Sequence, residues 1–476
     1  MPCPGLVSHP PTDRVGRLPS EAAMRARGRF YSRTGLTRKV ALLATPLIFQ
    51  QVSYTLLGVA DTFFVSRVST QALAAVGLGG VIFFAVALLF RGTASSSVVF
   101  IGRAYGADDD EAVGAWVWRC LAVVGLMSIV ALTIPWLFRQ GFGFIAPSDE
   151  PSVAVLGANY LFIRGFEIPF IMFSGVVWGY LVGRGDSRTP MILAWTTVLL
   201  NILLDWLLVL GNLGFPRLEV TGAAVATLIA NIVNATLSAA ILWAPAARRR
   251  YRTFLPPRLR RRDLAQVFKI GLPMGLGDCI EIASFSTFFA LIGHISTEAL
   301  AANQVAVQYM SMSFTVGIAF GMATSSLVAR QLGAGRPDLA EGLGYRGTVL
   351  GMVSMGLIGL GYLIAPGELM RLFSADPEVV QAGVRILRLV ALYQVFDAVT
   401  IVLAGALNGA GDTTFTMVAR TIMGWMVFIP LVALIVFQFG GGVHDAWIGA
   451  LVYLSGLSVI YLIRFRSGRW KSIKLV

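Results

Sequence analysis

The sequence predicts an all-α polytopic membrane protein, with about twelve transmembrane helices in two six-helix lobes related by pseudo-two-fold symmetry. Composition is the first observation: 56% of the 476 residues are hydrophobic and only 13% are charged. A soluble chain this apolar could not cover its own core. The second observation is that basic residues cluster in short segments between apolar runs, as in membrane loops. The net charge of +13 therefore does not predict binding to nucleic acid.

The apolar runs are long enough to cross a hydrocarbon core of about 30 Å as helices. Arginines gather after the second, fourth, sixth and eighth runs and in both tails, which predicts that both termini are cytoplasmic. The runs lie at about residues 40–65, 76–101, 115–138, 154–182, 190–211, 221–245, 264–291, 302–328, 346–365, 380–407, 414–438 and 445–464.

The third observation is an internal duplication. STQALAAVGLG at 69–79 aligns with STEALAANQVA at 296–306, and six of the eleven positions are identical. GYLVGRGD at 179–186 matches GALNGAGD at 405–412 with nearly the same offset along the chain. A nearly constant offset over so long a stretch indicates repeats. Each repeat has about six helices, and this even number gives both repeats the same orientation in the membrane.

The repeats predict five parts in the chain. Two parallel halves, with a site between or within them, are typical of a secondary transporter that works by rocking of one half against the other. The parts are a basic cytoplasmic tail at 1–37, a first lobe at 38–245, a cytoplasmic linker at 246–263, a second lobe at 264–465 and a basic C-terminal tail at 466–476.

The first lobe has two acids within its apolar runs, Asp61 and Asp205. A carboxylate at the centre of a membrane helix costs about 3 kcal/mol, so it needs a reason. Asn201 lies one helical turn before Asp205, so both project from one helix face. These oxygen ligands could hold a proton or a cation such as Na⁺. Phe288 and Leu431 stand at the equivalent positions of the second repeat. The alternative places both aspartates at the outer interface, solvated or capping helices.

The second lobe has its own acids, Asp278 and Glu281 on one helix and Asp397 on another. They could bind a cationic substrate or a coupling ion. Alternatively, they form hydrogen bonds with neighbouring helices and serve packing.

Two arginines also interrupt apolar runs. Arg91 needs a partner or water inside a membrane helix, and it could face Asp61. Arg164 lies almost one helical turn before Glu167, which predicts an ion pair between them.

Several side chains near these acids could line a cavity for planar cations, although each alone more often faces lipid or core. Pro46, which recurs as Pro273, could act as a hinge in the first helix because proline removes a backbone hydrogen bond. Proline is also ordinary near a helix start. The cavity candidates are Gln51, Tyr54, Arg91, Phe285, Gln304 and Met310.

Motifs of enzymes are missing from the sequence. The phosphate-binding pattern G-x-x-x-x-G-K-[ST] does not occur, and the three histidines and three cysteines are isolated. The sequence therefore predicts no enzymatic activity, no ATP hydrolysis and no bound cofactor.

Taken together, these motifs resemble those of multidrug and toxic compound extrusion (MATE) transporters, closest to the DinF-like branch. The resemblance covers about residues 38–465. It rests on LLGVADTFFVS, STQALAAVGLGG, NILLDWLLVLG followed by GAAVAT, GRGDSRTP, Glu281 after GLPMG, and FDAVTIVLAGALNGAGDT.

The resemblance implies a monomer in the plasma (bacterial inner) membrane that exports organic cations or amphiphiles in exchange for H⁺ or Na⁺. It implies that helix 1 bends at Pro46 on protonation, and that the C-lobe acids Glu281 and Asp397 dominate in another branch. For the DinF-like branch, it implies an ion-coupling site of Asp61, Asn201, Asp205 and a helix 6 threonine, which is Thr227 or its rival Thr221.

Two other functions stay open. One is a flippase for a lipid-linked saccharide or another amphiphile, although the acids favour cations. The other is a channel or membrane scaffold without coupled transport, although a channel would need a continuous polar stripe.

Overall fold

The computed structural model describes residues 33–144, 151–254 and 256–475, so most of the predicted N-terminal tail lies outside the described residues. The described part is helical and contains no β-strand. It has eleven helices that are long and apolar enough to cross a membrane. A bent pair, α7 (Pro151–Gly165) and α8 (Ile168–Gly183), adds a twelfth span. The predicted fold class is confirmed.

Six spans form the first lobe. Two of them are interrupted: α3 continues into α4 and α5 into α6. Besides α7 and α8, the first-lobe elements are α2 (Arg33–Ser66), α3 (Thr70–Ser95), α4 (Ser97–Gly106), α5 (Asp110–Ala131), α6 (Ile134–Gly141), η1 (Phe142–Phe144), α9 (Arg188–Leu208), η2 (Asn212–Gly214) and α10 (Glu219–Leu242).

Six further spans form the second lobe, which follows α11 (Pro245–Tyr251) in the linker. The span from residue 413 to 438 has two stretches of π-helix, η3 and η4, within it. The elements are α12 (Arg261–Gly293), α13 (Thr297–Gly333), α14 (Pro337–Ile364), α15 (Pro366–Arg371), α16 (Pro377–Ala410), α17 (Thr413–Thr421), η3 (Ile422–Phe428), α18 (Ile429–Ala433), η4 (Leu434–Gln438), α19 (Val443–Arg466) and η5 (Arg469–Ser472).

The two repeats begin their second helices in the same way. The Ser69 hydroxyl accepts a hydrogen bond from the backbone N–H of Ala72 at 3.0 Å. Ser296, at the equivalent position of the second repeat, accepts one from Ala299 at 3.0 Å. A serine at this position satisfies an N–H group that the first helical turn leaves free. The matching segments STQALAA and STEALAA thus set the start of α3 and of α13.

Prolines lie inside the long first helix of each repeat and at the bend between α7 and α8. Pro46 lies inside α2 and Pro273 inside α12, each several turns past the helix start. The interpretation of Pro46 as an ordinary helix-start proline is therefore wrong. Pro169 stands at the second position of α8, where its missing N–H and its ring interrupt the helix that α7 began. The bend between α7 and α8 is 42°.

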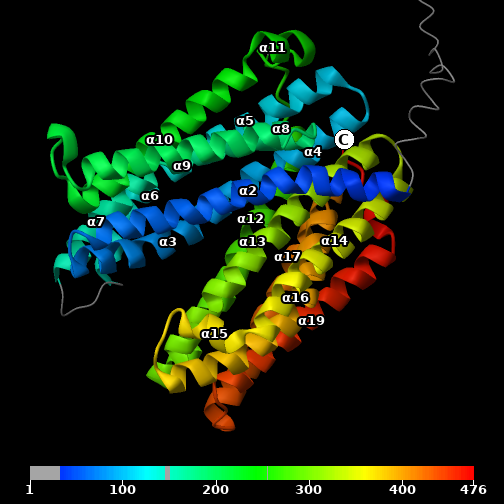
Figure 1. Ribbon diagram of the computed structural model, residues 1–476. Coiled ribbons are helices and arrows are strands. Elements are labelled where there is room, and N and C mark those ends of the chain that lie inside the picture. Colours follow the sequence, from blue (N-terminus) through cyan, green and yellow to red (C-terminus); the bar gives the residue numbers. More distant parts are fainter. Residues whose placement is uncertain (1–32, 145–150, 255, 476) are drawn as a thin grey trace, which may run out of the picture.

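The lobes meet at one end of the molecule, which we call the linker end because α11 and the C terminus lie there (Figure 1). There α4 packs against α13, and α3 packs against α12. The backbones come very close: a Cβ added to Gly92 would lie 2.6 Å from the Cα of Gly275. From this contact the helices of the two lobes diverge toward the opposite end, which we call the far end (Figure 1).

Candidate functional site

Four predicted residues of the first lobe lie together. Asp61 comes from α2, Asn201 and Asp205 from α9, and Thr227 from α10. Asp61 is 5% exposed, Thr227 1%, and the other two are fully buried. Asp61 and Asp205 are therefore not solvated.

Asn201 is the centre of this cluster. Its side-chain nitrogen donates to Asp61 Oδ1 at 2.9 Å and to Asp205 Oδ2 at 3.2 Å. Its oxygen faces Thr227 Oγ1 at 3.2 Å, and the Thr227 hydroxyl also lies 2.9 Å from the carbonyl oxygen of Ala223. The carboxyl groups of Asp61 and Asp205 are within hydrogen-bonding distance of each other. Since a carboxylate only accepts hydrogen bonds, such a contact needs a proton on one of the two groups.

An ion pair extends the cluster along the bend between α7 and α8. Arg164 Nε lies 2.6 Å from Glu167 Oε1, which confirms the predicted pair. Asn231 Nδ2 donates to Glu167 Oε2 at 3.1 Å and to the Thr227 carbonyl oxygen at 3.0 Å. Asn231 thereby connects the ion pair to the cluster. Sequence reasoning missed Asn231, although its position one turn after Thr227 on one helix face was a usable signal.

The charges of this region do not balance. Three buried acids, Asp61, Asp205 and Glu167, lie around Arg164, which interacts electrostatically with Asp61. With every group ionised, two negative charges would have no counter-charge among these four side chains. Membrane interiors rarely hold such charges unpaired. The cluster can therefore take up a proton or a monovalent cation.

Arg91 does not face Asp61, contrary to one possibility raised by the sequence. Its guanidinium carbon lies 4.6 Å from the centroid of the Tyr54 ring. The arginine near Asp61 is Arg164, which approaches from the end of α7, where this helix packs against α3 and α10.

In the second lobe, Arg420 of α17 organises two of the acids. Its Nη1 lies 2.8 Å from Asp278 Oδ1 and 3.1 Å from Glu281 Oε2. Asp397, on α16, is 5% exposed and has no ion pair in the described part of the chain. Sequence reasoning missed Arg420. It lies on another helix, far along the chain from Glu281, so there was no local pattern to detect.

The other predicted cavity residues have different surroundings. Phe285 packs against Phe428 and Tyr453 within an aromatic cluster of the second lobe. The Gln51 side-chain oxygen is buried and has no hydrogen-bond partner among the described residues. Gln304 is exposed, and Met310 is half-buried.

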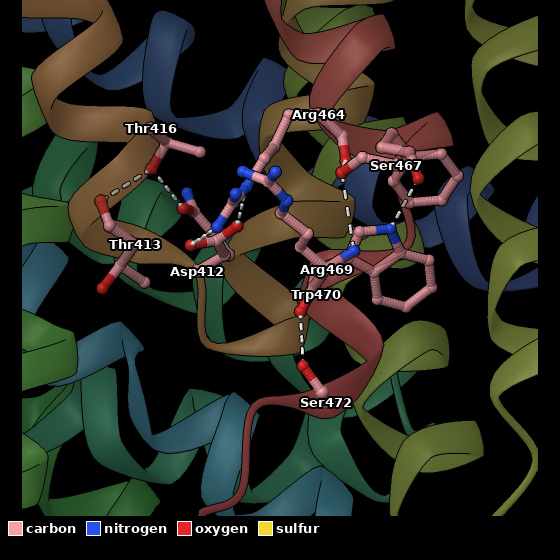
Figure 2. Close-up of polar contacts among 10 residues, drawn as sticks. Asp412, Thr413, Thr416, Arg464, Ser467, Arg469, Trp470 and Ser472 are labelled. Atoms are coloured by element: carbon pink, nitrogen blue, oxygen red, sulfur yellow. Dashed lines mark hydrogen bonds and ion pairs between the residues drawn. The ribbon is translucent and has the colours of Figure 1, made fainter.

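The repeated segments at 179–186 and 405–412 end in loops that stabilise the linker end. The Asp412 carboxylate accepts hydrogen bonds from Arg464 Nε at 2.8 Å and Nη2 at 3.3 Å (Figure 2). Trp470, in the C-terminal segment, is fully buried and donates from Nε1 to the Phe465 carbonyl oxygen at 2.8 Å. Asp186, at the position equivalent to Asp412, instead accepts from the backbone N–H of Thr189 at 3.1 Å. The second repeat therefore ties this loop to α19 and the C-terminal segment.

A protein-family model matches this chain twice, once in each repeat. The MatE family model fits residues 46–207 and again residues 273–434, so the two matches have equal length and each begins at the repeated proline. The chain belongs to the MatE family. Members of this MATE family are transporters rather than enzymes.

Curated relatives of this MATE chain extend over nearly its whole length. The probable multidrug resistance protein NorM of Thermotoga maritima is 27% identical over 441 residues, 92% of this chain and 93% of the relative. The multidrug resistance protein NorM of Burkholderia vietnamiensis is 28% identical over 457 residues, 91% of this chain and 97% of the relative. PmpM of Pseudomonas aeruginosa, also named a multidrug resistance protein, is 27% identical and covers 91% and 92%.

Solved structures share the fold of this MATE chain. A crystal structure of MATE in complex with MaL6 has a TM-score of 0.82 at 19% identity, covering 91% of this chain and 96% of the other. An outward-facing multidrug resistance MATE transporter has a TM-score of 0.81 at 19% identity, covering 91% and 97%. Both match the two-lobed fold.

Proposed function

We propose that this MATE protein is a secondary antiporter that exports cationic or amphiphilic drugs in exchange for protons. The curated relatives named multidrug resistance proteins support the substrate class, since each match spans more than nine-tenths of this chain. The arginine-rich linker supports a cytoplasmic linker end and cytoplasmic termini in the bacterial inner membrane. The proposal also includes a first lobe that ends at residue 245, a linker at 246–263, and a second lobe that begins at residue 264. It further includes a monomeric transporter.

The contact between Asp61 and Asp205 carries the choice of proton over Na⁺. The two carboxyl groups lie within hydrogen-bonding distance of each other. Because a carboxylate only accepts hydrogen bonds, this contact requires a proton on one of the two groups.

The position of α2 couples the exchange of drug and protons in this proposal. This helix carries Asp61 and Pro46, and it packs on α9 in its own lobe and on α13 in the other. The contact between lobes at the linker end corresponds to a state open to the outside, in which drug leaves and protons reach Asp61 and Asp205. Protonation of Asp61 or Asp205 removes negative charge from the contact between α2 and α9. In the proposal, α2 then packs differently, and this change switches the protein from the outward-open to the inward-open state.

The second lobe contributes the drug site in this proposal. Arg420 already neutralises Asp278 and Glu281 in part, whereas Asp397 is buried beside them without an ion pair in the described chain. We assign Asp397 to the cationic group of the drug and the neighbouring aromatic cluster to its planar part.

Transport in proteoliposomes tests the proposal. Purified protein should accumulate a fluorescent organic cation when an outward-directed proton gradient is imposed on vesicles of defined orientation, and a Na⁺ gradient alone should not drive uptake. Asp61→Asn should reduce gradient-driven uptake at least tenfold with normal expression.

Asp110→Asn is the matched control, because Asp110 forms an exposed ion pair with Arg250 at 3.1 Å. This variant should transport like wild type. Full uptake by Asp61→Asn would exclude the first-lobe site, and uptake driven by Na⁺ alone would exclude proton coupling. Transport of a lipid-linked saccharide in place of drugs would favour the flippase.

A further inference from the structure

The linker between the lobes carries a dense and unbalanced positive charge. Residues 246–263 contain eight arginines and one acid, Asp263. Asp263 is buried and pairs with Arg119 of α5, whose Nε lies 3.0 Å from Asp263 Oδ2. The one acid of the linker is therefore used in a contact with the first lobe and does not neutralise the linker arginines.

Six of these arginines are exposed and have no acid partner in the described part of the chain. The other two form exposed ion pairs at 3.1 Å, Arg250 with Asp110 and Arg252 with Glu111. Residues 1–32, which lie outside the described residues, contain five arginines and two acids, so by composition they add positive charge. The six arginines, which we call the basic patch, are Arg248, Arg249, Arg258, Arg260, Arg261 and Arg262.

Buried residues fasten the linker to the first lobe. Trp118 Nε1 of α5 donates to the Thr253 carbonyl oxygen at 3.0 Å, and the Thr253 hydroxyl donates to the Leu242 carbonyl oxygen of α10 at 2.7 Å. The carbonyl oxygen of the buried Tyr251 packs against Gly114 of α5, where an added Cβ would overlap it. These contacts hold the linker backbone in place while the arginines of the basic patch point away from the core.

The basic patch lies at the boundary of the membrane-spanning helices. α10 and α12 are both long and apolar enough to span, and α11 lies just beyond α10 at the linker end (Figure 1). Arg248 follows α10 within this short helix, and Arg261 begins α12. Two large apolar side chains lie among the arginines, Phe254 at 56% and Leu259 at 49% exposed. The Arg248 guanidinium stacks on Phe254, with 4.1 Å between Cζ and the ring centroid. Exposed apolar side chains between arginines are typical of a segment against lipid headgroups.

We propose that the basic patch binds the phosphate groups of anionic phospholipids in the leaflet next to the linker end. A guanidinium matches a phosphate with two parallel hydrogen bonds, and arginines next to a membrane helix attract anionic lipids. Phe254 and Leu259 favour a lipid over a soluble phosphate, because they can also contact the upper part of the acyl chains. This inference does not rest on the proposed efflux function, since lipid binding is measured without transport.

Local quenching of a fluorophore tests this surface. The fluorophore is attached at Ala246→Cys, an exposed position of α11, in the full-length protein without its native cysteines. The protein is reconstituted in phosphatidylcholine vesicles that contain a small fraction of phosphatidylglycerol or phosphatidylcholine brominated near the headgroup. Per lipid, brominated phosphatidylglycerol should quench about fivefold more efficiently, the factor expected for one arginine at an anionic surface. Raising the salt concentration should weaken this preference, because the arginines are exposed.

Two sets of four substitutions separate the basic patch from net charge. Glutamine at four patch positions should remove most of the preference for phosphatidylglycerol, whereas lysine at the same positions should keep most of it, since a phosphate attracts any exposed cation. The control removes four exposed arginines at the far end and should keep the wild-type preference. The patch positions are Arg248, Arg249, Arg260 and Arg262, and the control is Arg67→Gln, Arg139→Gln, Arg217→Gln and Arg371→Gln.

Three other results would overturn the inference. An unchanged preference in the glutamine variant of the patch would show that these arginines do not bind lipid. An equal loss in the far-end control would assign the preference to net charge, and an equal loss in the lysine variant would assign the arginines a structural role. Finally, excess glycerophosphoglycerol, which is the headgroup without acyl chains, should leave the preference in place. Its loss on this addition would assign the patch to a soluble anion and would also overturn the inference.

Discussion

Arg103 and Arg330 occupy equivalent positions in the two repeats, and each reaches across the linker-end contact into the same loop of the opposite repeat. Arg103 Nη2 donates to the Ala410 carbonyl oxygen at 2.6 Å. Arg330 Nη1 lies against Gly185, where an added Cβ would overlap it. Gly185 is equivalent to Gly411, the residue after Ala410. The duplicated sequence thus forms two equivalent contacts between the lobes, Arg103 with Ala410 and Arg330 with Gly185, which we together call the clasp.

The C-terminal segment joins this clasp from one side. Arg103 Nη1 donates to the Ile473 carbonyl oxygen at 2.8 Å, and Lys471 Nζ pairs with Glu341 at 2.6 Å. Arg103 of the first lobe therefore holds two separate parts of the second.

We expect Arg103→Ala to weaken the contact at the linker end. It removes two hydrogen bonds from a charged donor, which contribute about 2 kcal/mol or more together. The far ends of the lobes should then approach each other in a larger fraction of molecules. Electron paramagnetic resonance distances between spin labels at Ser66 and Glu298, at the far ends of α2 and α13, would measure this. Arg139→Ala, whose arginine faces Phe162 outside the contact, should keep the wild-type distances. Identical distributions in both variants would contradict the role of Arg103.

A side chain at Gly92 should block the same contact sterically. A Cβ there would lie 2.6 Å from the Cα of Gly275, and a helix backbone cannot move aside as a flexible side chain could. Gly92→Val should therefore reduce gradient-driven drug transport at least tenfold. Gly80→Val on the same helix is the control, because nothing lies within 4 Å of its added Cβ. Equal transport by the two variants would show that the lobes do not need this approach.

Loss of Asn231 should destabilise the first lobe. Asn231→Leu removes the hydrogen bond from Asn231 to the buried Glu167 carboxylate, which then keeps only Arg164 as a partner among the described residues, at a cost of about 1–3 kcal/mol. Thermal unfolding in detergent should occur several degrees lower, and drug transport should fall. Thr236→Val, at an exposed position of α10 whose hydroxyl bonds only to the Ile232 carbonyl, should unfold like wild type. An unchanged midpoint for Asn231→Leu would mean that water replaces this donor.

Arg420 should matter more to stability than either of its acids alone. Arg420→Met leaves the half-buried Glu281, whose side chain is 16% exposed, without its counter-charge. Breaking a fully buried pair, which is the upper limit here, costs about 3–5 kcal/mol. Adding Glu281→Gln to that variant should recover a large part of the loss. A double-mutant cycle of unfolding free energies measures the coupling between the two residues. Additive effects would show that the 3.1 Å pair contributes nothing.

The sequence by itself determined the class of fold, the number of spans and the duplication. These follow from patterns that are local or periodic: long apolar runs, and segments repeated at a constant offset. It also singled out Asp61, Asn201 and Asp205, because polar side chains inside apolar runs are costly and therefore conspicuous.

Only the tertiary structure decided which side chains pair between different helices. Arg164 rather than Arg91 lies near Asp61, and it comes from the end of α7, next to the 42° bend between α7 and α8. Arg420 reaches Asp278 and Glu281 from another helix, and Arg103 reaches the opposite lobe. Charge pairing over such separations depends on how helices pack, and packing is set by contacts among residues far apart in the chain, which no local pattern records.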